Sequence, residues 1–122
     1  MKILIADNFN PIVDDLINKL KILGYDDIEI ANTMQDAIFK ANSSTSLIIS
    51  DYNLPDNNGI ELLKRIRSGW ESVRLVPFII LCTEKDLLKT WHAAKKYKTE
   101  MLIKGYSVEQ LEYKINLALN KK

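Results

Sequence analysis

Short apolar runs alternate with longer amphipathic stretches along the whole chain. Five of these runs have the length of single strands: residues 3–6, 28–31, 47–50, 76–81 and 101–103. Four of them are rich in Ile, Leu and Val and carry few charges, which is typical of strands buried on both faces. Glu29 interrupts the run at 28–31, so we expect that strand to lie at an edge of the sheet.

The first amphipathic stretch has a signal for each of its ends. Asn10 is expected to cap a helix whose first turn contains Pro11, and Gly24 is expected to end it. Its apolar residues recur at helical spacing: Ile12, Val13, Leu16, Ile17, Leu20 and Leu23. This stretch is therefore predicted to be a helix with one buried face.

Four more helices are expected between and after the remaining runs. Thr33 is predicted to open the second helix, with Asp36 in a role like that of a capping box. Gly59 precedes the third, residues 85–97 give the fourth, and residues 107–120 give the fifth. Five strands that alternate with five helices predict an α/β fold of (βα)5 type, a doubly wound parallel sheet with helices on both faces.

In such a sheet the functional site lies beyond the carboxyl ends of the strands. The polar or reactive residues that follow the expected strands are Asp7, Asn8, Asp51, Tyr52, Asn53, Cys82, Thr83 and Lys104. Carboxylates at the ends of buried strands repel one another and lose hydration, so a compensating cation is expected. A divalent cation with oxygen ligands would supply it, and so would Lys104. An alternative is that the two aspartates only cap turns and that Lys104 forms a passing ion pair.

Phosphoryl transfer to a carboxylate is a reaction that this group of residues supports. An aspartate attacks phosphorus to form an acyl phosphate, while Mg²⁺, a lysine and a hydroxyl or backbone donor stabilise the phosphoryl oxygens. The protein needs little further covalent machinery, because the donor supplies the reactive group.

Composition narrows the class of protein. The 122 residues, 47% hydrophobic and 27% charged, suit one folded domain over 1–122. No stretch approaches the roughly 20 apolar residues of a membrane helix, and Asp7 comes too early for a signal peptide. The single Cys82 excludes an internal disulfide and a cysteine-rich zinc site, and the single His92 excludes a multi-histidine metal site. We expect a soluble cytoplasmic domain whose end, at residues 120–122, is frayed.

The charges are unevenly distributed along the chain. Residues 1–61 carry 10 acidic and 4 basic side chains, a net charge of −6, whereas residues 62–122 carry 6 acidic and 13 basic ones, a net charge of +7. The acidic half is suited to gather cations, and the basic half to meet an acidic partner or nucleic acid. The lysines at 95–98 also fit a solvated helix end, and Trp91 and Tyr97 fit either a core or a partner surface.

Residues 48–59, Ile-Ile-Ser-Asp-Tyr-Asn-Leu-Pro-Asp-Asn-Asn-Gly, resemble the third-strand block of the receiver domains of two-component response regulators. The block has an apolar run, an Asp, two residues, a Met or Leu, a Pro and a Gly four positions later, and Glu61-Leu-Leu-Lys-Arg-Ile-Arg67 continues it. The resemblance covers essentially the whole chain, and single-domain chemotaxis regulators are closest in length. It implies a flavodoxin-like receiver fold with strand order 2-1-3-4-5.

The resemblance also implies roles for individual residues. Asp51 would be the phosphoacceptor, Lys104 would pair with the phosphoryl group, and Asn53 would offer its backbone carbonyl to Mg²⁺. Asp7 would be the first of an acidic pair, but the second position holds Asn8 where the family has Asp. An amide oxygen ligates a hard cation without charge, so we expect weaker Mg²⁺ binding and slower phosphotransfer.

Other positions depart from the family pattern. Cys82 stands where the family has its switch Thr or Ser, and Thr83 where a small residue is usual. A thiol is a poor hydrogen-bond donor, so Cys82 is expected to be a small buried residue, with the Thr83 hydroxyl as a substitute after a register shift. Gly105 replaces a proline, Met101 stands where Tyr or Phe is common, and residues 96–98 replace an Ala-Gly-Ala-like helix end.

Three functions remain open. The leading one is a stand-alone receiver that accepts phosphate on Asp51 from a histidine kinase or phosphotransfer protein. With no output domain expected, it would signal through a protein target on the face of helix 4, strand 5 and helix 5, without nucleic acid. The second is a receiver-like binding module that acts without phosphorylation. The third is an enzyme, but Asn53 breaks the D-x-D pattern of an aspartate phosphatase, and residues 7–11 do not form the phosphate loop of a flavin protein.

Overall fold

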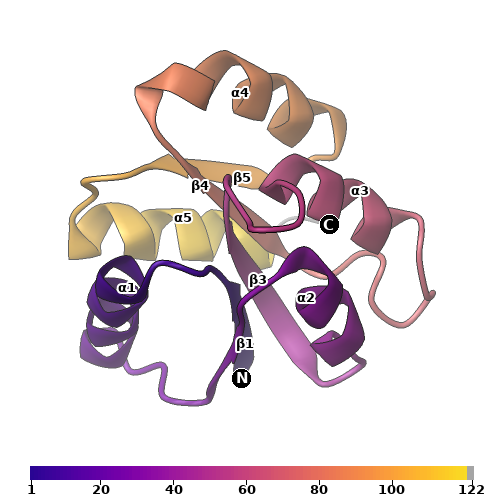
Figure 1. The fold of residues 1–122 in the computed structure, drawn as a ribbon. Coiled ribbons are helices and arrows are strands. Elements are labelled where there is room, and N and C mark those ends of the chain that lie inside the picture. Colours follow the sequence, from indigo (N-terminus) through magenta and orange to yellow (C-terminus); the bar gives the residue numbers. More distant parts are fainter. Residues whose placement is uncertain (121–122) are drawn as a thin grey trace.

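The computed structural model describes residues 1–120, so the frayed end predicted for the last residues lies mostly outside the described part. Five parallel strands form one sheet in the order β2-β1-β3-β4-β5 (Figure 1). The strands are β1 (Lys2–Ala6), β2 (Ile28–Ala31), β3 (Thr45–Asp51), β4 (Phe78–Cys82) and β5 (Glu100–Ile103). The predicted fold class and strand order are confirmed, and β2 is an edge strand as Glu29 indicated.

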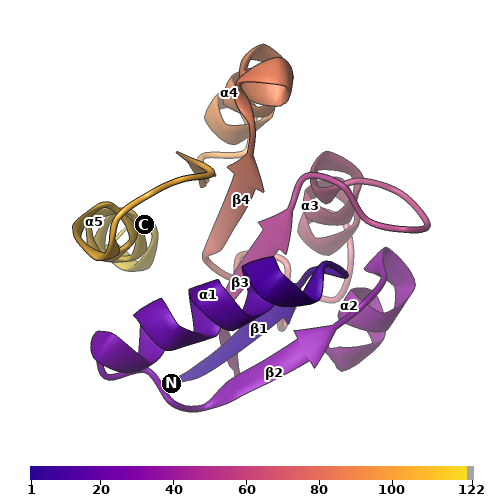
Figure 2. The same ribbon diagram turned by 60° about the vertical axis from the view of Figure 1, so that its left-hand side comes forward.

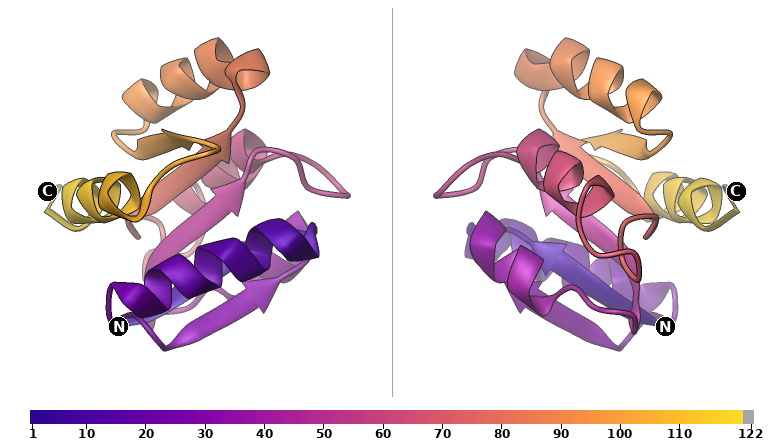
Figure 3. Two further views of the ribbon diagram at one scale, coloured as in Figure 1. Left: turned by 90° about the vertical axis from the view of Figure 1, so that its left-hand side faces the viewer. Right: turned by 90° about the vertical axis from the view of Figure 1, so that its right-hand side faces the viewer.

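Five helices alternate with the strands. They are α1 (Asn10–Ile22), α2 (Met34–Lys40), α3 (Gly59–Arg67), α4 (Leu87–Lys96) and α5 (Val108–Asn120), with a short 3-10 helix η1 (Glu84–Asp86) before α4. Helices α1 and α5 cover one face of the sheet, and α2 and α3 cover the other (Figure 1). Figure 2 shows β2 and α2 at one end of the sheet and α4 at the other, and Figure 3 shows that the strands point the same way.

Strand alternation divides the core into two layers. Ile3 and Ile5 of β1 pack under α1 and α5, whereas Leu4 and Ala6 pack under α2 and α3. All four side chains are fully buried. Because side chains on a strand point to opposite faces in turn, a central strand is expected to be apolar at most positions. The same rule makes a polar residue informative where it stands at the end of such a strand.

Several predicted element boundaries are wrong: β3 begins at Thr45 and not at residue 47, and the helix expected over 85–97 is the 3-10 helix η1 followed by α4. Two further differences have a clear physical reason. Phe9, not Asn10, takes the cap position of α1, because the backbone N–H groups of Ile12 and Val13 both bond to the Phe9 carbonyl. Strand β4 begins at Phe78 and not at residue 76. Pro77 has no N–H to donate to the sheet, although its carbonyl accepts a hydrogen bond from Ile48.

The predicted signals at the other helix ends are largely confirmed. Gly24 has φ +93°, a left-handed conformation that favours glycine after a helix end. Thr33 caps α2, its Oγ1 accepting the Asp36 N–H at 2.9 Å. The Asp36 carboxylate does not complete the capping box. It pairs with Lys40 at 3.1 Å instead. Helix α3 begins with Gly59 and is capped by Asn58, whose Oδ1 accepts the Glu61 N–H at 2.9 Å.

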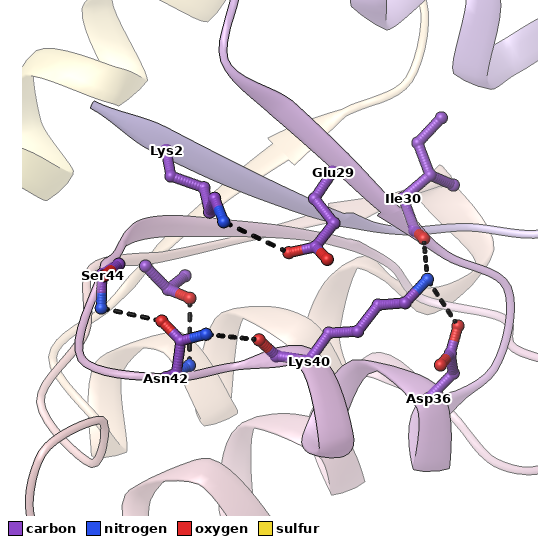
Figure 4. A network of polar contacts seen from close by, with 8 residues as sticks. Lys2, Glu29, Ile30, Asp36, Lys40, Asn42 and Ser44 are labelled. Carbon is purple, nitrogen blue, oxygen red and sulfur yellow. Dashed lines mark hydrogen bonds and ion pairs between the residues drawn. The ribbon is translucent and has the colours of Figure 1, made fainter.

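A network of polar contacts joins β2 to α2 (Figure 4). The Lys40 ammonium donates a hydrogen bond to the Ile30 carbonyl at 2.7 Å and also pairs with Asp36. Glu29 lies 3.9 Å from the Lys2 ammonium. An edge strand presents unpaired backbone groups with which another chain could pair. Here the Lys40 ammonium binds one of them, the Ile30 carbonyl, and charged side chains lie beside the strand. No helix in residues 1–120 is long and apolar enough to cross a membrane.

Candidate functional site

The carboxyl edge of the sheet brings together the polar residues that end four strands. Asp7 follows β1, Asp51 is the last residue of β3, Cys82 is the last residue of β4, and Lys104 follows β5. The Lys104 ammonium lies 2.5 Å from Asp51 Oδ1. Both carboxylates are buried, with Asp51 6% and Asp7 1% exposed. The two aspartates and the lysine that the sequence placed at separate strand ends therefore form one cluster.

Only one of the two carboxylate oxygens of Asp7 has a hydrogen-bond partner. Its Oδ1 accepts the Phe9 N–H at 3.0 Å, while Oδ2 is buried without a hydrogen-bond partner. Burial raises the pKa of Asp7, the negative charge of Asp51 adds to this rise, and the Phe9 N–H and the Lys104 cation oppose it. A buried carboxylate beside a second carboxylate is unfavourable unless a cation or a proton neutralises it.

This donor set fits a hard divalent cation. One ammonium faces two carboxylates, which leaves a net negative charge in the cluster. Asn8 and Asn53, both exposed, supply further oxygen atoms at the same edge. In residues 1–120, no three His, Cys, Asp or Glu side chains are grouped so that they could hold a metal ion together. Oxygen ligands of this kind suit Mg²⁺, although with fewer charges than three carboxylates would supply.

The loop after Asp51 folds back over the end of β3. The Gly59 N–H donates to the Tyr52 carbonyl at 2.8 Å, and Leu54 N–H donates to the Asn57 carbonyl at 2.9 Å. A Cβ at Gly59 would lie 2.6 Å from the Asp51 carbonyl oxygen, so only glycine permits this close approach. The glycine of the motif thus lets α3 start directly beside Asp51.

Asp56 has a structural role that sequence analysis missed. Its carboxylate accepts the Met34 N–H at 2.7 Å and the Gln35 N–H at 3.0 Å, so it holds the start of α2. Burial opposes ionisation of this group, but the two backbone donors outweigh it and lower the pKa of Asp56. No local signal indicates a partner 22 residues away. The Asn58 cap was missed too, although Asn58 and Glu61 have the spacing of a capping box.

Cys82 is part of the core. It is fully buried, it packs in the apolar layer beneath α2 and α3, and burial raises the pKa of its thiol. The nearby Thr90 is also fully buried, and its hydroxyl donates to the Asp86 carbonyl at 2.8 Å. Thr83 is exposed directly after β4 and precedes η1. Of these residues, Thr83 therefore offers an accessible hydroxyl at the edge where Asp51 lies.

Lys104 is held by backbone contacts. Its N–H donates to the Cys82 carbonyl at 2.8 Å, which continues the pairing of β5 with β4. Gly105 then adopts φ +93°, a conformation that proline cannot reach because its ring holds φ near −65°. Met101 is partly buried against the core, and His92 is exposed on α4, as expected of a solvated helix residue.

Comparison with known proteins gives a consistent result. The family model of the response regulator receiver domain matches residues 3–116. Chemotaxis protein CheY1 of Helicobacter pylori is 30% identical over 121 residues, covering 98% of this chain and 97% of the relative. The structure of the chemotaxis response regulator CheY4 of Vibrio cholerae matches with a TM-score of 0.80 and 27% identity, over 97% of this chain and 98% of the other. A putative response regulator from Chloroflexus aurantiacus has the same fold, with a TM-score of 0.84, 23% identity and 98% coverage of both chains.

Proposed function

The chain belongs to the response regulator receiver domain family of two-component signalling, and from this premise we propose that it accepts a phosphoryl group on Asp51. The donor would be a histidine kinase or a phosphotransfer protein. The observation that carries the proposal is the buried Asp51 carboxylate at the end of β3, 2.5 Å from the Lys104 ammonium and beside Asp7. Residues 1–122 would act as one receiver domain.

Each side chain has a defined task in this reaction. An Asp51 oxygen attacks the phosphorus atom of a phosphohistidine, the phosphorus–nitrogen bond breaks, and the histidine nitrogen keeps the electron pair. The product is an acyl phosphate on Asp51. Lys104 stabilises the added negative charge, and the exposed Thr83 hydroxyl is the donor available to a phosphoryl oxygen in place of the buried Cys82 thiol. Receiver domains are signalling modules rather than classical enzymes.

Receiver domains generally bind Mg²⁺ in their acidic pocket. Here Asp7, Asn8, Asp51 and Asn53 would hold it, with Asn53 acting through its backbone carbonyl. The bound cation would neutralise charge on the carboxylates and the phosphoryl oxygens. Because Asn8 replaces a charged ligand, we propose that Mg²⁺ binds more weakly than in a receiver with a full acidic pair.

A second function is favoured by two specific observations. The position of the family's switch hydroxyl is filled by a buried thiol, and one metal ligand is uncharged. These features suit a binding module that works without phosphorylation. In either case the downstream partner would be a protein that docks on α4, β5 and α5. The cytoplasmic location expected from the sequence stays a prediction.

Phosphorylation by a small molecule tests the first function. The protein is incubated with Mg²⁺ and acetyl phosphate, its intact mass is measured, and any adduct is mapped. We expect one phosphoryl group on Asp51 and no adduct on Asp51→Asn. We also expect no adduct when Mg²⁺ is chelated before the acetyl phosphate is added. Asn8→Asp should bind Mg²⁺ about tenfold more tightly, because it restores a charged ligand.

The negative result needs its own control. A receiver of known activity is treated in parallel with the same reagents. If that protein is labelled, and neither the wild type nor Asn8→Asp is, phosphorylation of Asp51 by this route is contradicted and the binding module is favoured. Labelling that persists in Asp51→Asn would contradict the assignment of the phosphoacceptor.

A further inference from the structure

A hollow lies between α3 and α4, beside the loop that follows Asp51. It has a volume of about 480 Å³, which is enough for a small molecule. Its α4 residues, Lys89 and His92, face α3, whereas Trp91 and Lys95 of the same helix line a different hollow toward β5. The α3–α4 hollow is therefore separate from the face formed by α4, β5 and α5, and its lining does not include the acidic cluster at the strand ends.

The loop residues of the α3–α4 hollow present hydrogen-bond donors. The side-chain oxygen of Asn57 accepts the Asn58 N–H at 3.0 Å, and that of Asn58 accepts the Glu61 N–H at 2.9 Å. A backbone N–H bonds to the oxygen of an amide and not to its nitrogen, so these contacts fix the orientation of both side chains. The two NH₂ groups have no hydrogen-bond partner in residues 1–120, and they are the donors left for a ligand.

Two ammonium groups belong to the same hollow but come from different helices. Lys64 on α3 and Lys89 on α4 both line it, both are exposed, and neither forms an ion pair within the described part of the chain. The acidic residue of the lining is Glu61. Two positive charges against one negative charge give the lining a net charge of +1 when His92 is neutral, so the hollow favours an anion.

The Tyr52 hydroxyl indicates a ligand independently of these charges. Tyr52 lines the hollow and is only 9% exposed, yet its hydroxyl has no hydrogen-bond partner in residues 1–120. In that part of the chain, the side-chain polar atoms that are sealed from solvent without a partner belong to Asp7, Glu29 and Asp51, so the Tyr52 hydroxyl keeps access to solvent. Because a largely buried phenol normally finds a partner, this hydroxyl is a further donor available to a bound molecule.

A phosphoryl group matches this set of donors better than a carboxylate does. The lining offers two ammonium groups, two amide NH₂ groups and one hydroxyl. A phosphoryl group presents three acceptor oxygens and about −1.5 to −2 charges at neutral pH, whereas a carboxylate has two oxygens and a single charge. The half-buried Ile60 and the His92 ring also line the hollow, so an organic part of the ligand would have apolar surface to pack against.

We propose that the α3–α4 hollow binds a small organic phosphate. The phosphoryl oxygens would accept hydrogen bonds from the two lysines and from the two amide NH₂ groups. Binding does not rest on the proposed function, because it needs neither Mg²⁺ nor a reaction at Asp51. The ligand would nevertheless contact the loop that folds back over the end of β3, next to the proposed phosphoacceptor.

The test titrates the full chain, labelled with ¹⁵N and kept in a chloride buffer with EDTA, with adenosine monophosphate, glucose 6-phosphate and phosphoenolpyruvate. We expect at least one of them to bind with a Kd of about 1 mM or below and to shift the side-chain amide signals of Asn57 and Asn58. The same molecule without its phosphoryl group should bind at least about tenfold more weakly. Asp51→Asn should keep the Kd within about twofold of wild type.

Matched variants test the lining itself. Lys64→Gln/Lys89→Gln should weaken binding about tenfold, because it removes both ammonium groups. The control Arg65→Gln/Lys96→Gln removes one cation from each of the same two helices outside the hollow, and should change the Kd by less than about twofold. Glu61→Gln should tighten binding about threefold, since it removes the negative charge of the lining.

Several outcomes would overturn the proposal. If none of the three phosphates binds at about 10 mM, the hollow is not such a site. Equal weakening by the two glutamine pairs would mean general charge attraction, and shifts at Lys104 in place of Asn57 and Asn58 would place the anion in the acidic cluster. Inorganic phosphate that binds as tightly as the organic phosphates, or a single-stranded oligonucleotide that binds more tightly, would contradict a small organic ligand. A chain that is phosphorylated on Asp51 but gives any of these results fails here alone, and the proposed function stands.

Discussion

The two edge strands of the sheet, β2 and β5, differ in how the charged side chains beside them are used. At the β2 edge, charged side chains bind to each other and to the backbone: Lys40 contacts Asp36 and the Ile30 carbonyl, and Lys2 faces Glu29 (Figure 4). At the β5 edge, several lysines face a hollow that also exposes Trp91. Charges at the first edge are paired within the chain, whereas the second edge presents lysines beside an exposed aromatic ring.

The strand order turns a difference along the chain into a difference in space. The acidic residues 1–61 build β2, β1 and β3, and the basic residues 62–122 build β4 and β5. Because the order is 2-1-3-4-5, the boundary between the two halves falls between β3 and β4, and the strands of the two halves do not interleave. The strand order thus places the charge of each half of the chain on its own side of the sheet.

The largest effect is expected at the β2 edge. Lys40→Met keeps the aliphatic stem but removes the hydrogen bond to the Ile30 carbonyl and the pair with Asp36, so the free energy of unfolding should fall by about 1.5 kcal/mol. Lys95→Met at the β5 edge should change it by less than about 0.5 kcal/mol. Urea unfolding of both variants measures the difference, and equal losses would contradict the contrast between the edges.

The next effect has opposite signs at neighbouring positions. Lys98→Gly relieves the left-handed strain and should raise the free energy of unfolding by about 1 kcal/mol. Lys96→Gly, inside α4, should lower it by about 1 kcal/mol because glycine is a poor helix former. Thermal unfolding of the two variants would sharpen the comparison. A loss of stability in Lys98→Gly would mean that the backbone there is not strained.

The free energy of unfolding is expected to depend on pH through the contact of Asp56 with the start of α2. In the folded protein the pKa of Asp56 lies below its ordinary value of 3.8, since two backbone N–H donors favour the carboxylate. The stability from this contact is therefore complete above pH 3.8 and is lost as the pH falls through the lower folded pKa. Asp56→Asn should remove this part of the acid dependence, measured as the difference in urea midpoint from wild type between pH 6 and about pH 2.5. A constant difference over that range would exclude the contribution.

The smallest effect concerns Leu75, an exposed residue that lines a hollow where β4 and β5 begin. Leu75→Ser should change the free energy of unfolding by less than about 0.5 kcal/mol, because Leu75 is 77% exposed. Its neighbour Val76 is only 7% exposed, so Val76→Ala should cost clearly more. Urea midpoints of the two variants provide the check. A cost at Leu75 as large as that at Val76 would show that Leu75 packs in the core.

Much of the fold was predictable because its signals are local. The apolar runs at 3–6 and 47–50 are continuous, as buried parallel strands require, and Thr33 and Gly24 mark helix ends by their own chemistry. The prediction that Asn10 caps α1 was wrong because it used only a local signal. Its choice rested on residue type alone, whereas the Phe9 carbonyl receives the first helical hydrogen bonds.

The candidate site was predictable in part. Position at a strand end was enough to bring Asp7, Asp51 and Lys104 to one edge, because parallel strands share their carboxyl edge. The Asp56 contact with α2 was not predictable, since its partners lie 22 and 21 residues away and no pattern in the chain links them. The burial of Cys82 agrees with the expectation that it acts as a small apolar residue.

The sequence by itself determined the order of strands and helices along the chain, the residues that follow each strand and the charge carried by each half. These follow from periodicity and residue chemistry, which act over a few neighbouring positions. Only the tertiary structure decided that Asp7 Oδ2 is buried without a partner, that Lys98 is left-handed, and that Leu75 and Trp91 line one groove. Those properties depend on how elements far apart in the chain pack together, and packing is set by the whole fold.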